Sequence, residues 1–402
     1  MSADELALFE LMAPVSPRPG ERWPDYKRKV EEKLGPVLER ATHFLGLASQ
    51  PLFAANGFSG RLTSDQRQEI RRGVLGPSVR WIDWSLEIDA SQIAIVAQRL
   101  GWDRPASPKP FSGRGVRVAV LDSGIDTTHP FLNVMESIST CGEETQSPGR
   151  HATFCAGVIA ARHPQYSGIA PAVDLLNIKT SRADGVTTPA YLAQGIDEAL
   201  DRRADVLSLS CGLNQADHRW HCLDGHCLLC RAVDNAVSCG ALVVTAAGNL
   251  HRRHADSAPQ PRTEILCPAQ ARQALTVGAV EKISFPKLYR PSSRGPTAYG
   301  LQKPDLVAPG GDVLSTVPVP AGHEQADPSS MLRLFSRESG TSVAAAVVAG
   351  AVALLIERRT REGREWTPVD IREELLTRFV RPLDGAPLEA VGAGCLDLSG
   401  LG

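Results

Sequence analysis

The sequence predicts an α/β protein in which a doubly wound, mostly parallel sheet follows a small N-terminal α+β domain. Short, continuously apolar segments recur in the second part of the chain, as expected for strands buried on both faces of a parallel sheet. Predicted helices lie between several of these strands, and this alternation is typical of a doubly wound sheet. The predicted strands span 116–121, 173–178, 206–209, 241–246 and 274–280, and the helices include 188–203 and 228–238.

The N-terminal domain is expected to span residues 1–102. Apolar residues recur at helical spacing over 30–45, although Gly35-Pro36 should break or kink that helix. Strands are expected over 51–62 and 79–88, and the pair Thr63/Gln66 indicates a capping box that opens a helix between them.

A boundary is expected at residues 103–115, which hold three prolines and two glycines and have no periodic apolar pattern. The chain then changes at once to an apolar strand. This divides the protein into residues 1–102, the linker 103–115 and a large domain over 116–402.

Composition limits the expected partners. The 43 Lys and Arg against 45 Asp and Glu give a formal net charge of −2, and only 5% of the residues are aromatic. We therefore expect no nucleic-acid partner, because such proteins carry a basic surface or a stacking platform.

The N-terminus lacks the basic and apolar regions of a secretory signal, and the apolar run 343–356 is too short to cross a bilayer. No membrane association is expected, and the expected location is the cytoplasm, with export by a route without a signal as the alternative.

Four residues have the types and positions needed for nucleophilic catalysis. Asp122 follows the first strand of the large domain, where the reactive groups of parallel sheets collect. His151 begins a predicted helix, Asn249 follows the strand over 241–246, and Ser342 precedes the most apolar helix. Each is open to an ordinary interpretation when taken alone: a turn residue, a helix-start residue or an N-cap.

Together, the four motifs resemble those of the subtilisin-like serine proteases, with an S8-type peptidase domain. The segments VAVLDSGIDTTHP at Asp122, AAGN at Asn249 and SGTSVAAAVVAG at Ser342 are similar to the family's motifs, and the order Asp, His, Asn, Ser agrees. The resemblance extends from Gly115 onward and implies a serine endopeptidase that acts on polypeptides.

The resemblance also implies a role for each residue. Ser342 would be the nucleophile, His151 the general base and acid, Asp122 the group that orients the imidazole, and Asn249 a donor to the oxyanion. Two segments look like the edges that bind the extended substrate. Their candidate residues are Ser210, Cys211, Gly212, Asp184 and Gly185.

The sequence departs from the family pattern around two of these motifs. The family usually has a glycine on each side of the histidine and a second histidine three residues later. In this sequence those positions hold Arg150, Ala152 and Phe154. After Ser342, the usual Met, Pro and His are replaced by Val343, Ala346 and Val347. An active protease with altered rate and pocket shape is the preferred interpretation. The alternative is a weak or inactive peptide-binding protein with the same fold.

No cofactor is expected. The segment 162–168, which corresponds to the family's strong calcium loop, is short and has no Asn or Asp, so we predict that this calcium site is absent. Cys222, Cys227 and Cys230 could contribute to a zinc site. Their spacing is not a standard one, and we expect free or disulfide-bonded cysteines in preference to metal ligands.

The N-terminal domain resembles the inhibitory propeptide of subtilisins, on the stretch NGFSGRLTSDQRQEI and the strand that follows it. This resemblance implies a zymogen whose own N-terminal domain blocks the cleft, with cleavage between about Ala90 and Phe111. An unrelated interaction domain is the alternative.

Overall fold

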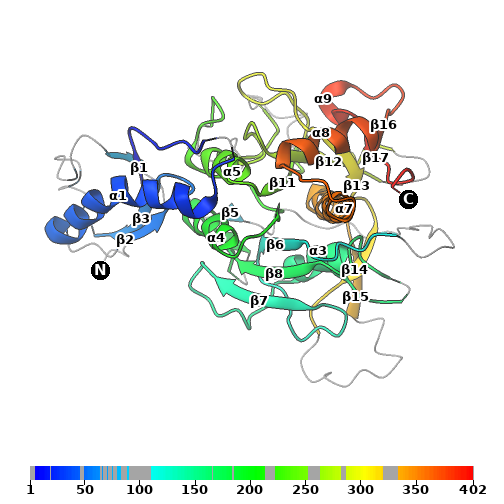
Figure 1. The fold of residues 1–402 in the computed structure, drawn as a ribbon, viewed down its shortest axis with the longest axis horizontal. Helices are drawn as coiled ribbons and strands as arrows, with labels where there is room; N and C mark the ends of the chain where they lie inside the picture. Colours follow the sequence, from blue (N-terminus) through cyan, green and yellow to red (C-terminus); the bar gives the residue numbers. More distant parts are fainter. Residues whose placement is uncertain are drawn as a thin grey trace.

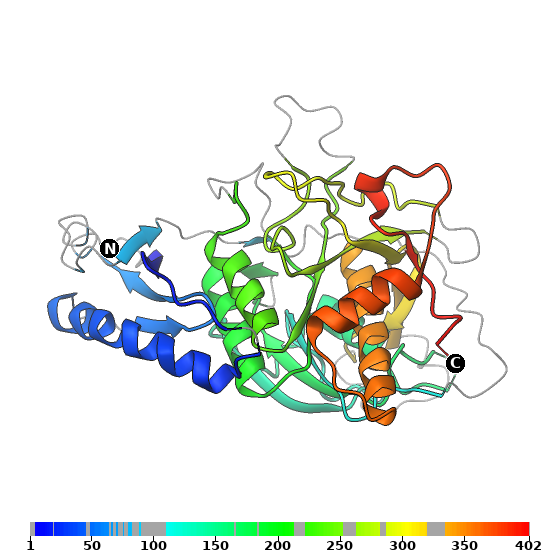
Figure 2. The same ribbon diagram turned by 45° about the horizontal axis from the view of Figure 1, so that its top comes forward.

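The computed structural model has a nine-stranded sheet, a four-stranded sheet and two two-stranded sheets, and the part of the chain that holds the four-stranded sheet packs on helices of the nine-stranded one (Figures 1 and 2). The described residues are 5–18, 20–45, 49–63, 66, 70, 75, 79–82, 88–89, 110–164, 166–182, 185–212, 222–251, 263–281, 287–319 and 334–401. Residues 103–109 of the predicted linker, and residues 90–109 of the expected cleavage region between about Ala90 and Phe111, lie outside them.

The large domain is built on a nine-stranded sheet in the order β16-β17-β13-β12-β11-β10-β6-β8-β7. Neighbouring strands pair in parallel except for β16 with β17, so the predicted doubly wound, mostly parallel sheet is confirmed. Its strands are β6 (Arg117–Asp122), β7 (Val134–Ser139), β8 (Asp174–Lys179), β10 (Val206–Leu209), β11 (Leu242–Ala246), β12 (Leu275–Val280), β13 (Leu306–Pro309), β16 (Val380–Arg381) and β17 (Cys395–Leu396).

Helices cover both faces of this sheet. Alternate residues of a strand point to opposite faces, and along β6 Val118 and Val120 join one apolar core while Ala119 and Leu121 join the other. The first core contains α3 (Arg150–Ala160) and α7 (Thr341–Arg361), and the second contains α4 (Pro189–Asp201) and α5 (Leu228–Ser238). This arrangement brings the N-termini of α3 and α7 to the edge of the sheet where β6 ends.

Helix α7 is longer than the predicted apolar run 343–356. In the described part of the chain it is the one helix long and apolar enough to cross a membrane by length and composition, and its most apolar window is entirely buried. Its packing explains the composition: a Cβ at Gly350 would lie 2.6 Å from Ile169 Cβ. The apolar surface of α7 is therefore covered by the protein's own core.

Smaller elements complete the large domain around this core. The hairpin of β14 and β15 packs its first strand on α3, where the Ser315 and Thr316 hydroxyls donate to helix carbonyl groups at 2.8 and 2.7 Å. Helix α8 begins with a capping box between Thr367 and Asp370. The remaining bounds are β9 (Val186–Thr187), β14 (Val313–Thr316), β15 (Phe335–Glu338), α8 (Pro368–Arg378) and α9 (Leu388–Val391).

The N-terminal domain has a four-stranded antiparallel sheet in the order β2-β3-β1-β4, with one long helix. Of the break or kink expected at Gly35-Pro36, the break is wrong, because the helix runs through Pro36 without interruption. The hydrogen bonds of the predicted Thr63/Gln66 capping box are present, at 2.8 and 3.3 Å. The bounds are β1 (Glu5–Leu11), α1 (Trp23–Leu45), β2 (Ser49–Leu52), β3 (Gly57–Leu62), β4 (Val79–Ile82) and β5 (Ile88–Asp89).

Two other expectations for this domain need correction. The predicted strand over 51–62 is two strands, β2 and β3, because the chain turns at residues 53–56, where Asn56 has a φ of 56°. The predicted strand over 79–88 is present as β4 and, separately, β5, which pairs with β9 of the large domain.

The N-terminal domain packs against α4 and α5. Figures 1 and 2 show it (blue) beside these two helices (green), and the second apolar core includes its residues Trp23, Tyr26 and Leu52. At the other end of the predicted linker, the backbone N–H groups of Ser112 and Gly113 both donate to Glu357 at 2.6 Å, which fixes the start of the large domain to α7.

Candidate active site

Asp122 is the last residue of β6 and is buried. Its Oδ1 accepts hydrogen bonds from the backbone N–H of Ser123 at 2.6 Å and from the Ser123 hydroxyl at 3.0 Å. The chain then turns at Gly124, whose φ of 96° favours glycine. These contacts hold Oδ1 and leave Oδ2 free to bind a group on α3.

That group is His151. Its Nδ1 lies 2.8 Å from Asp122 Oδ2. Burial by itself lowers the pKa of His151, but the adjacent Asp122 carboxylate outweighs burial and holds the pKa well above its usual 6.5. Burial likewise raises the pKa of Asp122, and the charge and hydrogen bond of His151 leave it below 3.8. The two groups therefore form an ion pair in which the Asp122 side chain is buried and the His151 side chain is 20% exposed.

Ser342 is the second residue of α7, after the N-cap Gly340 and Thr341. The first N–H groups of a helix have no partner within it, and the helix dipole places partial positive charge at this end. Ser342 is buried, with 1% of its surface exposed. Its backbone N–H is therefore suited to bind an anion that forms beside its own side chain.

Asn249 is fixed against the start of α7. Its Oδ1 accepts hydrogen bonds from the backbone N–H of Thr341 at 3.0 Å and from the Thr341 hydroxyl at 3.3 Å. The same hydroxyl accepts from the Gly248 N–H at 3.1 Å. Because Oδ1 is engaged in this way, the Asn249 amide nitrogen is left to donate elsewhere.

Cys155 and Ser210 connect His151 to Ser342. Cys155 Sγ lies 4.0 Å from His151 Nε2 and 3.8 Å from Ser210 Oγ, and the Ser210 hydroxyl donates to the Ser342 carbonyl at 3.3 Å. A series of contacts thus links Asp122 and His151, through Cys155 and Ser210, to the main chain at Ser342, and Asn249 contacts the neighbouring Thr341. Within the described residues no hydrogen bond joins the Ser342 hydroxyl to His151.

The predicted substrate edges are partly described. Ser210, Cys211 and Gly212 directly follow β10, and Gly185 precedes β9 with a φ of 85°; Asp184 lies outside the described residues. A Cβ at Gly212 would lie 2.9 Å from Leu266 Cβ, so a larger residue would not fit there. Burial raises the pKa of the Cys211 thiol, which favours its neutral form.

The departures from the family pattern have local explanations. The Arg150 side chain binds β15, where its Nε donates to Glu338 at 2.9 Å. Ala152, Phe154, Ala346 and Val347 are buried in the core that contains α3 and α7. The replacements therefore fill the space between the two helices with apolar side chains and leave the Asp122–His151 contact intact.

The three predicted cluster cysteines lie together, and a fourth that the sequence reasoning missed, Cys267, joins them. No sequence motif pointed to Cys267 as a member of the group, because Cys267 lies 37 positions after Cys230. The fold brings the two residues together. At 162–168, the predicted absence of calcium stays a prediction.

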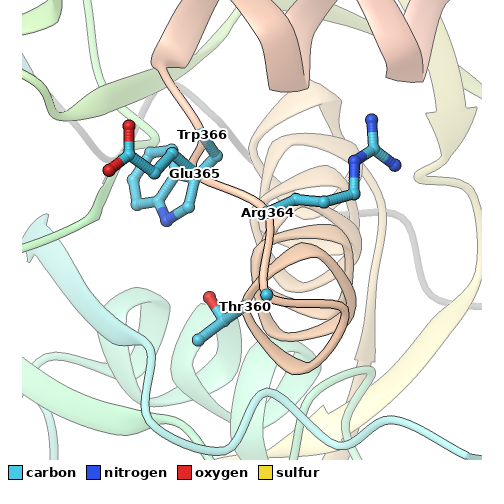
Figure 3. Close-up of a pocket in the computed structure, with 5 residues that line it drawn as sticks. Thr360, Arg364, Glu365 and Trp366 are labelled. Carbon is cyan, nitrogen blue, oxygen red and sulfur yellow. The ribbon is translucent and has the colours of Figure 1, made fainter.

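One surface hollow is remote from this cluster. It is lined by Thr360, Gly363, Arg364, Glu365 and Trp366, in the connection between α7 and α8 (Figure 3). Thr360 is 18 residues along α7 from Ser342, which corresponds to about 27 Å of helix. None of the predicted site residues lines it.

Comparison with known families matches residues 113–394 to the subtilase family, Peptidase_S8. The serine protease AprX of Bacillus subtilis (strain 168) is 30% identical over 308 residues, covering 71% of this chain and 66% of AprX. Subtilisin E of the same organism is 31% identical over 274 residues, covering 66% of this chain and 60% of subtilisin E. The chain thus aligns with less than two thirds of the length of these two relatives.

Two further proteins are similar over more of their own length. The intracellular serine protease of Paenibacillus polymyxa is 31% identical over 307 residues, covering 73% of this chain and 82% of that protein. Among solved structures, the prenylagaramide maturation protease PagA superposes with a TM-score of 0.55 at 26% identity, covering 71% of this chain and 92% of PagA.

Proposed function

Because the chain belongs to the subtilase family, we propose that it is a serine endopeptidase that hydrolyses peptide bonds of polypeptides through an acyl-enzyme on Ser342. The observation that carries the proposal is the 2.8 Å pair of Asp122 and His151 beside the helix N-terminus that bears Ser342. Relatives named as serine proteases support it.

The proposed reaction uses the three residues in sequence. Ser342 Oγ attacks the substrate carbonyl carbon while His151 Nε2 takes the hydroxyl proton. His151 then gives this proton to the leaving amine as the peptide bond breaks, and a water molecule hydrolyses the acyl-enzyme by the same proton transfers. Asp122 holds the imidazole through Nδ1 and stabilises the imidazolium.

Two donors would stabilise the negative charge that forms on the carbonyl oxygen. The Ser342 N–H lies at the positive end of α7, and the Asn249 amide is positioned by the hydrogen bonds that its Oδ1 accepts from Thr341. Fixed donors of this kind stabilise the transition state more than the bound substrate.

The substrate is proposed to bind as an extended strand between two edges. Ser210, Cys211 and Gly212 would form one edge, and Asp184 and Gly185 the other. The pairing of Ile88 and Asp89 with Val186 and Thr187 supports this, because a strand from the N-terminal part already occupies the second edge next to Gly185.

We also propose that the chain is a zymogen, with the N-terminal domain as its own inhibitor. This domain packs on α4 and α5, and its β5 reaches the proposed substrate edge. Cleavage between about Ala90 and Phe111 would separate it from the large domain. A cytoplasmic location is proposed too, supported by the relative named an intracellular serine protease.

A fluorophosphonate probe tests the endopeptidase proposal. We expect covalent labelling of the chain after the N-terminal domain is removed, and loss of labelling in Ser342→Ala but not in Ser399→Ala, which changes a remote serine. Absence of labelling from the folded wild-type protein would favour the alternative, a weak or inactive peptide-binding protein. The replacement of the usual residues around His151 by Arg150, Ala152 and Phe154 is the observation that favours that alternative.

Self-processing has a separate test. The purified wild-type chain should be cut in the linker and Ser342→Ala should remain at full length, as mass spectrometry of both proteins would show. Clipping of Ser342→Ala at the same rate, without added protease, would contradict self-processing while leaving the endopeptidase proposal standing.

A further inference from the structure

Four cysteine side chains meet where α5 begins and where the chain approaches β12. The Sγ atoms of Cys222, Cys227, Cys230 and Cys267 all lie within 4.8 Å of one another. Three of the pairs are Cys227 and Cys267 at 3.1 Å, Cys222 and Cys230 at 3.5 Å, and Cys230 and Cys267 at 3.6 Å. Three of the four residues are buried and Cys227 is half-buried.

These distances are those of a tetrahedral metal site. Four thiolates about 2.3 Å from a central zinc ion lie about 3.8 Å from one another. A disulfide joins only two sulfur atoms, at about 2.05 Å. Here Cys230 and Cys267 each approach two other sulfurs, so the cluster is a four-way arrangement and not two separate pairs.

The local backbone supports negatively charged sulfur at this place. Cys227 is the N-cap of α5, and its Sγ accepts a hydrogen bond from the Cys230 N–H at 3.4 Å. A helix N-terminus stabilises a thiolate. Arg272 brings positive charge to the loop that contains Cys222 by donating to the Asp224 carbonyl at 3.3 Å.

The loop between the first two cysteines has a conformation that only a small residue allows. Gly225 has a φ of 72°, and a Cβ on it would lie 2.6 Å from the ring of Tyr299. Gly225 thus lets the short connection turn back so that Cys222 lies against Cys230 on α5.

We infer that Cys222, Cys227, Cys230 and Cys267 bind one structural zinc ion through their four sulfur atoms. Binding converts the four thiols to thiolates and releases their protons to solvent. With four protein ligands the coordination is complete, as in structural sites, and no position is open for substrate or water. This inference replaces the expectation of free or disulfide-bonded cysteines, which was based on three cysteines without Cys267.

The ion would fasten α5 to the segment around Cys267. That segment contacts the end of the β10 edge, because a Cβ at Gly212 would lie 3.0 Å from the Cys267 carbonyl oxygen and 2.9 Å from Leu266 Cβ. Zinc would therefore hold one wall of the proposed substrate cleft. The zinc assignment itself does not rest on the proposed function.

Metal analysis of the full-length Ser342→Ala chain tests the site without interference from self-digestion. The protein is purified without chelator from cells grown with added zinc, and zinc is measured by mass spectrometry. We expect about one zinc per chain, released in full by a mercurial reagent that binds thiolates. Cys230→Ser and Cys267→Ser should each lose at least about tenfold in zinc content.

Cys239→Ser is the matched control, because Cys239 ends the same helix and lies outside the cluster; it should keep its zinc. If the cluster variants fail to fold, the Ser342→Ala chain with its four cysteines intact is loaded with cobalt instead. A site of four thiolates then gives the intense absorption bands of tetrahedral cobalt, and their absence would contradict the inference. Four results would each overturn the inference: folded protein without zinc, disulfides among the four cysteines, iron in place of zinc, or undiminished zinc in both variants.

Discussion

The ion pair of Asp122 and His151 determines when the imidazole can act as a base. His151 must be neutral to accept the Ser342 proton, and the nearby carboxylate holds its pKa well above 6.5 in the folded protein. The charged form therefore persists to higher pH than in a free histidine. By the same linkage, the pair stabilises the fold fully below pH about 6.5 and loses that contribution as the pH rises through the raised pKa of His151.

We accordingly predict that kcat/KM of the processed enzyme rises with pH along a limb whose midpoint lies above 6.5. The measurement is a pH–rate profile on a peptide substrate, with the stability of the enzyme checked at each pH. Asp122→Asn should lower kcat by roughly 10⁴, the factor measured for the equivalent change in trypsin-type triads and borrowed here. A limb centred at or below pH 6.5 would show that His151 is not paired in this way.

The Asn249 amide is predicted to act mainly in the transition state. Asn249→Ala should lower kcat by about 10²–10³ with little change in KM, by analogy with the measured loss for the oxyanion asparagine of subtilisin. Asn133→Ala, which changes an exposed asparagine, is the control. An equal loss through KM alone would assign Asn249 to substrate binding.

The places of the candidate site residues at the ends of helices and strands were predictable where a local motif marks them. Asp122, Asn249 and Ser342 each follow or precede a recognisable apolar element, and that placement is local in sequence. Cys267 was not predictable, because its partners lie on α5 and in the loop before it. The fold brings these segments together: Cys267 lies in the connection between β11 and β12, two strands that pair in parallel.

At the scale of single elements, α1 shows why a local rule failed. A proline inside a helix costs about 3 kcal/mol, since it removes one hydrogen bond and crowds the preceding turn. One face of α1 is nonetheless fully buried on both sides of Pro36, at Tyr26, Val30, Leu34 and Ala41. Burial of each of the larger of these side chains contributes about 1.5–3 kcal/mol to the stability of the fold. Packing against the four-stranded sheet and against α4 and α5 therefore outweighs the proline, which sequence spacing cannot show.

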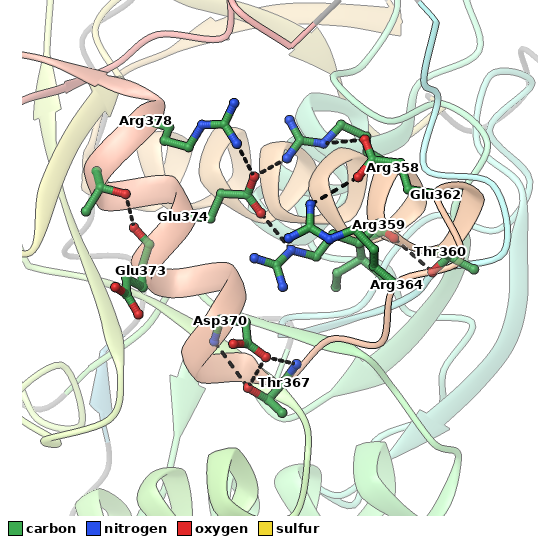
Figure 4. A network of polar contacts seen from close by, with 12 residues as sticks. Arg358, Arg359, Thr360, Glu362, Arg364, Thr367, Asp370, Glu373, Glu374 and Arg378 are labelled. Atoms are coloured by element: carbon green, nitrogen blue, oxygen red, sulfur yellow. Dashed lines mark hydrogen bonds and ion pairs between the residues drawn. The ribbon is translucent and has the colours of Figure 1, made fainter.

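Helices α7 and α8 are joined by a network of charges centred on Glu374 (Figure 4). Glu374 accepts hydrogen bonds from Arg358, from Arg359 at 2.7 Å and from Arg378 at 3.2 Å. Burial raises the pKa of Glu374, but the hydrogen bond from Arg359 and the two positive charges on α7 leave it below 4.5. Its contribution to stability is therefore present above pH about 4.5 and is lost as the pH falls through the lowered pKa.

Glu374→Gln is predicted to lower the free energy of unfolding by roughly 2–3 kcal/mol at pH 7, because Arg358 is largely buried and keeps only the more exposed Glu362, at 3.5 Å, as a counter-charge. Urea denaturation of the Ser342→Ala chain measures this without self-digestion. Glu373→Gln alters the exposed neighbour on the same helix and should change stability by less than about 0.5 kcal/mol. Equal effects of the two variants would mean that the network is only a surface feature.

At the scale of the whole molecule, a buried carboxyl group lies in the contact between the two domains. Asp197 of α4 accepts the backbone N–H groups of Phe53 and Ala54, each at 2.7 Å. The nearby Asp201 accepts from Trp23 at 2.8 Å and from Lys27 at 2.6 Å. The sequence predicted that the two domains would interact, but it gave no sign of this contact, because a carboxylate on a helix is usually exposed to solvent.

Burial under the N-terminal domain raises the pKa of Asp197 to about 8, even though two N–H donors oppose the shift. Without that domain Asp197 would be open to solvent and its pKa should approach 3.8. At a pH between about 3.8 and about 8, Asp197 therefore takes up a proton when the N-terminal domain docks. The sign follows directly: docking is strongest below pH about 4 and weakens as the pH rises toward 8, by up to about tenfold in dissociation constant per pH unit.

This predicts that release of the N-terminal domain from a chain cut in the linker is promoted by alkaline pH. Gel filtration of the nicked Ser342→Ala protein between pH 5 and pH 9 measures the fraction of N-terminal fragment that stays bound. Asp197→Asn, which is neutral at every pH, should flatten this dependence. Asp201→Asn should weaken docking by loss of the Lys27 and Trp23 contacts but keep the slope. Retention that increases with pH, or an unchanged slope in Asp197→Asn, would mean that Asp197 does not take up the proton, and the pH control of the domain contact would have to lie in another group.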